Sequence, residues 1–225
     1  MKYDIVIATK NRSEALKLTI PLMLDQSCPP NKLIIVDASD NHQKVCEIVE
    51  KVTNTKVEIV NTSANLPYQR NRSFEFIESE IVMFPDDDSF FWPGVSESIL
   101  KIFKRDIDGV IGGVCPKSVK ELPPKISEED FPFRITRYDN LNKNNQKYRV
   151  KFENFFFPNP KYILGNYLAK ELTVPKWLSE ENAIVVPHMT GLCMTFRSDV
   201  IKKKGFSPEL GKLIGWTGGE DAEAC

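Results

Sequence analysis

The first 115 residues alternate between short apolar runs and amphipathic segments. Runs rich in β-branched residues, which are typical of buried strands, occur at 3–8, 33–36, 57–60, 81–84 and 110–114. Helical spacing of apolar residues predicts helices at 13–26, 42–52 and 67–78, and a further helix from Pro93 to just before Gly109. Strands that alternate with helices in this way form βαβ units, so the pattern predicts an α/β fold with a mainly parallel sheet.

Ligands of such sheets bind at the carboxyl ends of the strands. The first strand is followed by a turn without glycine, whereas dinucleotide-binding Rossmann sites and P-loops both need glycine there. A hydrolytic triad is poorly supported, because the chain has no Gly-x-Ser-x-Gly elbow and only 2 histidines. The fourth strand, in contrast, is followed by three carboxylates, Asp86, Asp87 and Asp88.

Three adjacent carboxylates repel one another, and a hard cation that takes oxygen ligands removes that conflict. In an extended segment alternate side chains share a face, so Asp86 and Asp88 are expected to point together while Asp87 turns away. A solvated acidic turn before the helix at Pro93 is the alternative, and the cluster alone does not decide between them.

Composition changes this picture little. The chain has 225 residues, 41% of them hydrophobic, which is enough for one sizeable core, and its net charge of -1 gives no reason to expect a nucleic-acid partner. No run approaches the roughly 18 apolar residues of a membrane helix, and the first residues lack a signal-peptide pattern. We therefore expect a cytoplasmic location, with the 5 scattered cysteines as reduced thiols.

Six segments resemble, in chain order, the motifs of glycosyltransferase family 2. They correspond to its opening strand, its second strand with an acidic loop, its Ala-Arg-Asn helix start, its Asp-x-Asp element with a following proline, its acceptor-side Gly-x-x-Met-x-Phe-Arg strand and its Glu-Asp motif. In this sequence the segments are Ile5 to Arg12, Ile34 to Asp40, Gln69 to Arg72, Phe84 to Asp88 with Pro93, Met189 to Arg197, and Gly219 to Asp221. Ala38 and Ser89 stand where the family often has acids, which leaves the nucleotide preference open.

The resemblance implies the GT-A fold, a Rossmann-like mixed sheet flanked by helices, in one domain over 1–225. Residues 1–115 would form the half that binds a nucleotide-sugar, and 116–225 the acceptor-side half with an irregular insert at 116–187. The chain ends in a hydrophilic, helix-like stretch, so we expect it to be truncated at its C-terminus.

The resemblance also implies roles for individual residues. The donor would be contacted by Thr9, Arg12, Asp37, Arg70 and Asp86, and a Mn²⁺ or Mg²⁺ ion would be held by Asp88 and Asp86. The general base would be Asp221. The acceptor would be bound by Glu220, Trp216 and Gly191. Most have a plainer alternative. Asp37 could cap a helix, Arg12 could be solvated, and Trp216 could pack in the core. Arg70 is expected at a helix start, where the helix dipole disfavours a cation, and this placement supports a functional role.

The implied activity is inverting transfer of a sugar from a nucleoside-diphosphate sugar to a glycan, lipid-linked or other hydroxyl acceptor, in glycan or cell-surface polysaccharide synthesis. A metal-dependent nucleotidyltransferase and a non-catalytic nucleotide- or sugar-binding protein are the alternatives. Residues 131–176 carry nine Lys or Arg against three Asp or Glu, which suggests peripheral contact with the inner face of a membrane.

Overall fold

The computed structural model describes residues 1–119, 121–127, 175–184, 189 and 191–207. The chain divides into two compact units, one formed by 1–126 with 188–225 and the other by 127–187. The sheet and every site residue discussed below belong to the first unit. In the second unit the described residues include one short 3-10 helix, η3 (Lys176–Glu181).

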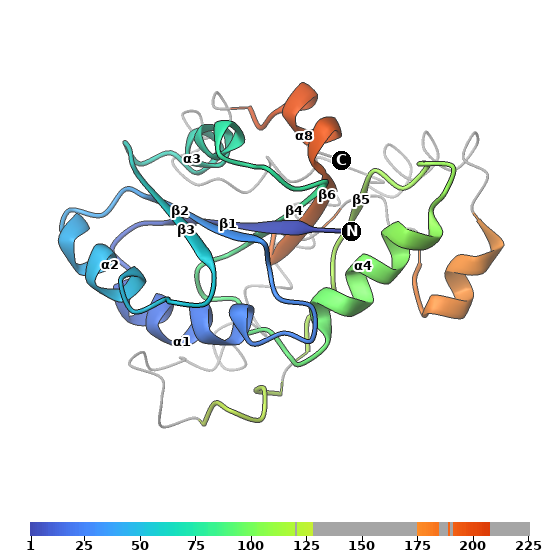
Figure 1. Ribbon diagram of the computed structural model, residues 1–225, viewed down its shortest axis with the longest axis horizontal. Helices are drawn as coiled ribbons and strands as arrows, with labels where there is room; N and C mark the ends of the chain where they lie inside the picture. Colours follow the sequence, from blue (N-terminus) through green and yellow to red (C-terminus); the bar gives the residue numbers. More distant parts are fainter. Residues whose placement is uncertain (120, 128–174, 185–188, 190, 208–225) are drawn as a thin grey trace, which may run out of the picture. The chain divides into compact units, whose positions relative to one another are not determined.

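A six-stranded sheet forms the centre of the first unit. Its strands are β1 (Tyr3–Thr9), β2 (Lys32–Asp37), β3 (Lys56–Asn61), β4 (Ile81–Pro85), β5 (Gly113–Val114) and β6 (Cys193–Arg197). They lie in the order β3-β2-β1-β4-β6-β5 (Figure 1). The first four are parallel, and β6 runs antiparallel to both β4 and β5. The mixed, mainly parallel sheet predicted from the sequence is therefore confirmed.

Helices cover both faces of this sheet. They are α1 (Ser13–Leu24), α2 (His42–Val49), α3 (Leu66–Arg72) with the 3-10 turn η1 (Ser73–Glu75), α4 (Val95–Arg105) and α8 (Ser198–Lys204). Figure 1 shows α1, α2 and α4 on one face and α3 and α8 on the other. Among the described residues, no helix has the length and apolar character that crossing a membrane requires.

Two apolar clusters pack on the two faces of the sheet. Alternate residues of each central strand join opposite clusters: in β1, Ile5 and Ile7 face the side of α1, α2 and α4, while Val6 faces the side of α3 and α8. The second cluster is rich in phenylalanine, with the rings of Phe84 and Phe206 5.3 Å apart in an edge-on arrangement. Because both faces are covered, the strands read as continuous apolar runs in the sequence.

Several predicted elements are shorter than expected: the helices predicted at 13–26, 42–52 and 67–78 end at Leu24, at Val49 and, with the 3-10 turn, at Glu75. Two further differences have a clear local cause. Helix α4 begins at Val95 rather than at Pro93, because Gly94 precedes it with a φ of 83°, outside the helical region. The strand expected at 110–114 is reduced to β5, because the backbone N–H groups of Val110 and Ile111 donate to the carboxylate of Asp106 instead of a neighbouring strand.

Candidate functional site

The loops that follow β1 and β2 are joined by a set of reciprocal hydrogen bonds. Asn11 adopts a φ of 57°, and its backbone N–H donates to the hydroxyl of Ser39 at 2.7 Å. Its side-chain amide donates to Asp40 Oδ2 at 2.8 Å and accepts from the Asp40 backbone N–H at 2.9 Å. Asparagine tolerates this left-handed conformation better than most residues, so Asn11 both turns the chain and fastens the two loops together.

Asp87 is the buried member of the acidic run. It is 6% exposed, and its Oδ2 accepts a 2.7 Å hydrogen bond from Thr9 Oγ1, at the end of β1. Its backbone carbonyl accepts from the hydroxyl of Thr19 in α1 at 3.0 Å. Burial raises the pKa of Asp87, and the hydrogen bonds from Thr9 and Arg12 oppose that rise. Asp87 therefore ties the loop after β4 to β1 and α1.

Arg12 bridges Asp87 and Asp88. Its guanidinium lies 3.0 Å from Asp87 Oδ1 and 2.6 Å from Asp88 Oδ2. The charge of Asp87, followed in importance by that of Asp88, raises the pKa of Arg12 despite partial burial. The side chain of Asp88 is 53% exposed, so it is the carboxylate of the run that solvent reaches most easily. Arg12 is thus ion-paired with two of the three carboxylates and offsets part of their negative charge.

Arg70 holds the remaining carboxylate. Its guanidinium is 3.3 Å from Asp86 Oδ1, with side-chain exposures of 3% for Arg70 and 33% for Asp86. The guanidinium carbon also lies 5.4 Å from the centre of the Phe206 ring. The expected placement of Arg70 at a helix start is wrong, because it stands in the last turn of α3, where the helix dipole favours a cation.

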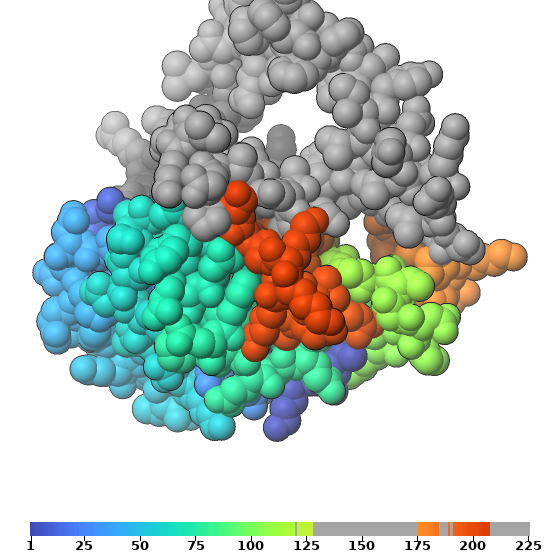
Figure 2. Space-filling view, turned by 90° about the horizontal axis from the view of Figure 1, so that it is seen from above, coloured from blue at the N-terminus to red at the C-terminus, as the bar shows by residue number. Residues whose placement is uncertain are grey.

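Residues 198–207 pack against α3 and support Arg70 from below. Figure 2 shows them in orange-red beside the teal-green surface of α3 and η1. The contact is specific: the side-chain amide of Asn71 donates to the Phe206 carbonyl at 2.7 Å and accepts from the Phe206 N–H at 2.8 Å. A segment 135 residues away in the sequence thereby positions Phe206 under Arg70.

Asp37 ends β2 and is 0% exposed. Its Oδ1 accepts from the backbone N–H of Ser39 at 2.9 Å, and its Oδ2 lies 2.7 Å from Nδ1 of His42. His42 is a site residue that the sequence interpretation missed. The available signal was its place five residues after Asp37, at the start of the next helix.

Gln69 was also missed. It is 4% exposed, and its amide donates to the carbonyls of Thr9 at 3.1 Å and Val36 at 2.9 Å, so it pins α3 to the carboxyl ends of β1 and β2.

The acceptor-side residues are only partly described. Gly191 lies in the turn before β6, and the carbonyl of the next residue, Leu192, accepts from the Asp86 N–H at 3.1 Å and from the Ser89 hydroxyl at 2.6 Å. Gly191 is therefore adjacent to the acidic loop. Trp216, Glu220, Asp221 and the segment 131–174 lie outside the described residues.

Asp86 and Asp88 have the oxygen chemistry that a hard divalent cation prefers. Within the described part of the chain, no group of three or more His, Cys, Asp or Glu side chains gathers to hold an ion. Two carboxylates fit a cation that completes its shell with substrate phosphates and water, which is how magnesium is usually held.

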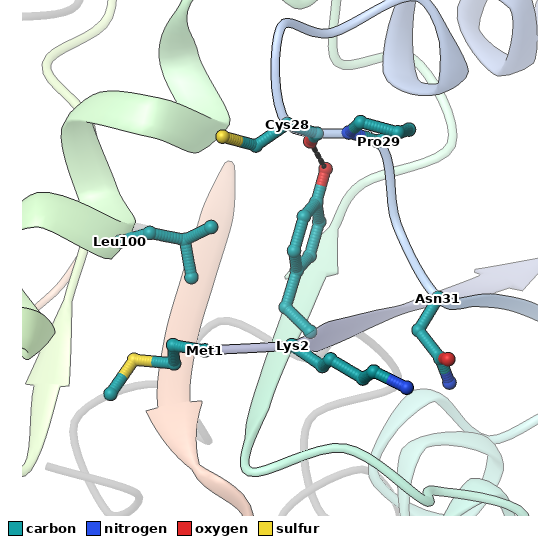
Figure 3. A pocket seen from close by; sticks show the side chains of 7 residues that line it. Met1, Lys2, Cys28, Pro29, Asn31 and Leu100 are labelled. Carbon is teal, nitrogen blue, oxygen red and sulfur yellow. Dashed lines mark hydrogen bonds between the residues drawn. The ribbon is translucent and has the colours of Figure 1, made fainter.

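A small cavity of about 190 Å³ lies at the opposite, amino-terminal end of β1 (Figure 3). It is lined by residues that include Lys2, Pro29, Asn31 and Leu100, and the Tyr3 hydroxyl beside it donates to the Cys28 carbonyl at 2.7 Å. This cavity is separate from the site at the carboxyl ends of the strands.

Comparison with known proteins identifies the family of this chain. The family model described as glycosyl transferase family 2 matches residues 4–165. No curated protein matches the chain in sequence.

Solved structures share the fold. A mannosyltransferase from Pyrobaculum calidifontis, PcManGT, solved with GDP-Man and Mn²⁺, superposes with a TM-score of 0.59 at 15% identity, covering 99% of this chain and 50% of that one. TarS 1–349 of S. aureus, solved with UDP, gives 0.52 at 16% identity, with coverages of 99% and 53%. The chain therefore spans about half the length of these solved chains.

Proposed function

Because the chain belongs to glycosyltransferase family 2, we propose that it transfers a sugar from a nucleoside-diphosphate sugar to a hydroxyl acceptor. The observation that carries the proposal is the arrangement of Asp86 and Asp88 after β4, with Arg12 from the loop after β1 paired to Asp88 and Arg70 from α3 paired to Asp86. Arginine side chains pair well with phosphate oxygens, and carboxylates can hold a divalent cation that also binds phosphate. This edge of the sheet supplies both kinds of group.

The dimensions of the site support an extended donor. β2, β1 and β4 are consecutive neighbours in the sheet, so their carboxyl ends span two strand spacings, or about 10 Å. The nucleoside would lie toward the end of β2, and the diphosphate and sugar toward Asp86 and Asp88 after β4. Arg12 and Arg70 would lie beside the diphosphate, because they are ion-paired with Asp88 and Asp86 respectively.

Asp88 and Asp86 would hold Mn²⁺ or Mg²⁺. An ion held there would supply positive charge that stabilises the negative charge growing on the diphosphate as the sugar–phosphate bond breaks. The presence of Mn²⁺ with GDP-Man in the mannosyltransferase complex supports the same choice. Arg12 would have to release Asp88 for the carboxylate to serve as a ligand. Its guanidinium, still paired with Asp87, could then also bind a phosphate.

Asp221, in the Glu-Asp motif, would act as the general base. It would take the proton from the acceptor hydroxyl as that oxygen attacks the anomeric carbon opposite the leaving diphosphate. A single displacement of this kind inverts the anomeric configuration. The acceptor would be bound by Glu220, Trp216 and Gly191. The position of Gly191 supports its role, because the turn that contains it is hydrogen-bonded to Asp86 through the carbonyl of Leu192.

The proposed setting is glycan or cell-surface polysaccharide synthesis at the cytoplasmic side of a membrane. The basic segment 131–176 would contact anionic lipid. Unchanged binding to anionic vesicles after charge reversal of its lysines would contradict that contact.

The decisive experiment is a turnover assay with a panel of nucleotide-sugars and Mn²⁺, which detects release of the nucleoside diphosphate. Sugar transfer predicts that release, and Asp221→Asn should abolish it while donor binding persists. A nucleotidyltransferase would instead release pyrophosphate from a nucleoside triphosphate. A non-catalytic binder would bind nucleotide with no turnover in either variant.

A further inference from the structure

The carboxylate of Asp37 is closed off from ligands. Its side chain is 0% exposed, Oδ1 is engaged by the Ser39 N–H at 2.9 Å, and Oδ2 is engaged by His42 at 2.7 Å. A direct contact between Asp37 and a nucleoside would require this arrangement to open. The imidazole of His42, which bonds Oδ2 of Asp37, is itself reached by solvent, with its side chain 33% exposed.

The pairing with Asp37 determines what His42 can offer. An ionised carboxylate only accepts hydrogen bonds, so Nδ1 of His42 is the donor in this pair. In the neutral ring Nε2 then carries a lone pair and accepts. Among the described residues, Asp37 is the hydrogen-bond partner recorded for His42, and Nε2 has none.

His42 also stands at the right end of the proposed donor site. It is the first residue of α2, directly after the loop that follows β2. Asp37 is in register with Thr9, and Thr9 in turn bonds Asp87 of the acidic run. His42 is therefore separated from the acidic run by the ends of β2 and β1, where the nucleoside of the proposed donor would lie.

We propose that His42, oriented by Asp37, contacts the nucleobase of the donor and favours a base that carries a ring N–H, namely uracil or guanine. The acceptor Nε2 would receive that N–H, whereas cytosine and adenine present a ring-nitrogen lone pair at the equivalent edge and would be repelled. Asp37 is then a positioning residue that acts through His42. This inference rests on the proposed function, because it assigns the base end of that same donor site.

The test is calorimetric titration of the full chain with UDP, GDP, CDP and ADP in the presence of Mn²⁺. The wild-type protein should bind UDP or GDP most tightly. Comparing these two nucleotides shows whether the preferred base is uracil or guanine. His42→Ala should weaken binding of that nucleotide by about tenfold, the equivalent of one good hydrogen bond, and should leave binding of CDP and ADP the same or tighter, because the repulsion from Nε2 is removed. Gln43→Ala, an exposed neighbour on the same helix, is the matched control and should match the wild type.

A double-mutant cycle separates the roles of the two residues. Asp37→Asn should reduce base selectivity when His42 is present, and should have little further effect in the His42→Ala background. Loss of binding on Asp37→Asn in both backgrounds, with no effect of His42→Ala, would assign the base contact to Asp37 and overturn the inference. Equal weakening of all four nucleotides, or a preference for CDP or ADP, would overturn it as well. A wild-type protein that binds none of the four with Mn²⁺ would overturn the proposed function itself.

Discussion

Thr9 and Asp87, 78 residues apart in the sequence, share a buried hydrogen bond of 2.7 Å that joins the end of β1 to the loop after β4. The residues on either side of Asp87 are the two carboxylates to which we assign the metal. A contact that fixes Asp87 therefore also sets where Asp86 and Asp88 can point.

Thr9→Val tests this contact with almost no change in side-chain shape. Valine cannot donate, so Oδ2 of a 6%-exposed carboxylate loses its partner, which should destabilise the protein by about 1.5–3 kcal/mol. The measurement is the free energy of unfolding in urea. Thr9→Ser keeps the hydroxyl and serves as the control. If valine destabilises the protein no more than serine does, the hydrogen bond does not contribute as described.

Arg12→Gln should increase the affinity for Mn²⁺. Arg12 occupies Asp88 in this structure, so its removal frees the carboxylate and should tighten Mn²⁺ binding about two- to fivefold in the absence of nucleotide, the range of an exposed ion pair. Electron paramagnetic resonance of free Mn²⁺ measures this affinity.

Lys17→Gln is the control for Arg12→Gln, because the Lys17 side chain is also 50% exposed and ion-paired, with Glu14, but lies outside the site. It should leave Mn²⁺ affinity unchanged. Weaker Mn²⁺ binding in Arg12→Gln would contradict the competition between guanidinium and metal for Asp88.

Asn11 offers a pair of substitutions that separate backbone strain from side-chain bonding. Asn11→Gly keeps access to the φ of 57° and loses the bonds to Asp40, which should cost about 1 kcal/mol. Asn11→Ala loses the same bonds and adds about 1–2 kcal/mol for the left-handed conformation. Chemical denaturation of the two variants should therefore rank alanine below glycine. Equal stabilities would show that the loop changes conformation at no cost.

Asp106 predicts a defined dependence of stability on pH. Burial alone would raise its pKa, but the hydrogen bonds from Arg197 and from the backbone N–H groups of Ile111 and Val110 lower it overall. A depressed carboxyl pKa stabilises the fold above the unfolded-state value, and that contribution is lost as pH falls through the folded-state value. Asp106→Asn should thus cost about 3 kcal/mol at pH 7, because the partly buried Arg197 loses its 2.7 Å ion pair.

The difference between wild type and Asp106→Asn should shrink as pH falls from about 4, the ordinary aspartate pKa in the unfolded state, down through the lower folded-state pKa of Asp106. Urea unfolding at a series of pH values measures it. Asp108→Asn, at an exposed position two residues away, should show no such effect. A destabilisation that stays constant down to acid pH would contradict the ionic origin of the contribution.

Hydrophobic periodicity predicts most of this fold because the central strands are buried on both faces and the helices present one apolar face each. It does not predict the start of α4 or the length of β5. Those depend on the backbone angle at Gly94 and on the two N–H groups that donate to Asp106, and the spacing of apolar residues carries no information on either.

The sequence predicts which residues form the candidate site better than it predicts how they are arranged. The order of polar residues after the strands identifies Thr9, Asp37 and the acidic run. The placement of Arg70 depends on a tertiary contact with Phe206. The closure of Asp37 depends on His42, which is only five residues away but is identified as its partner only by the structure.

The most direct test of the account is a thermal-shift measurement with nucleoside diphosphates, with and without Mn²⁺, on the wild type and Asp88→Asn. A nucleotide at 100 times its Kd contributes about 2.7 kcal/mol, or about 5–10 °C for a chain of this size. We predict a shift of that order for the wild type only when Mn²⁺ is present, and its loss in Asp88→Asn. A wild-type midpoint that no nucleotide shifts in a Mn²⁺-dependent way, or an Asp88→Asn variant that keeps the full shift, would contradict the assignment of the acidic run to a metal-dependent donor site.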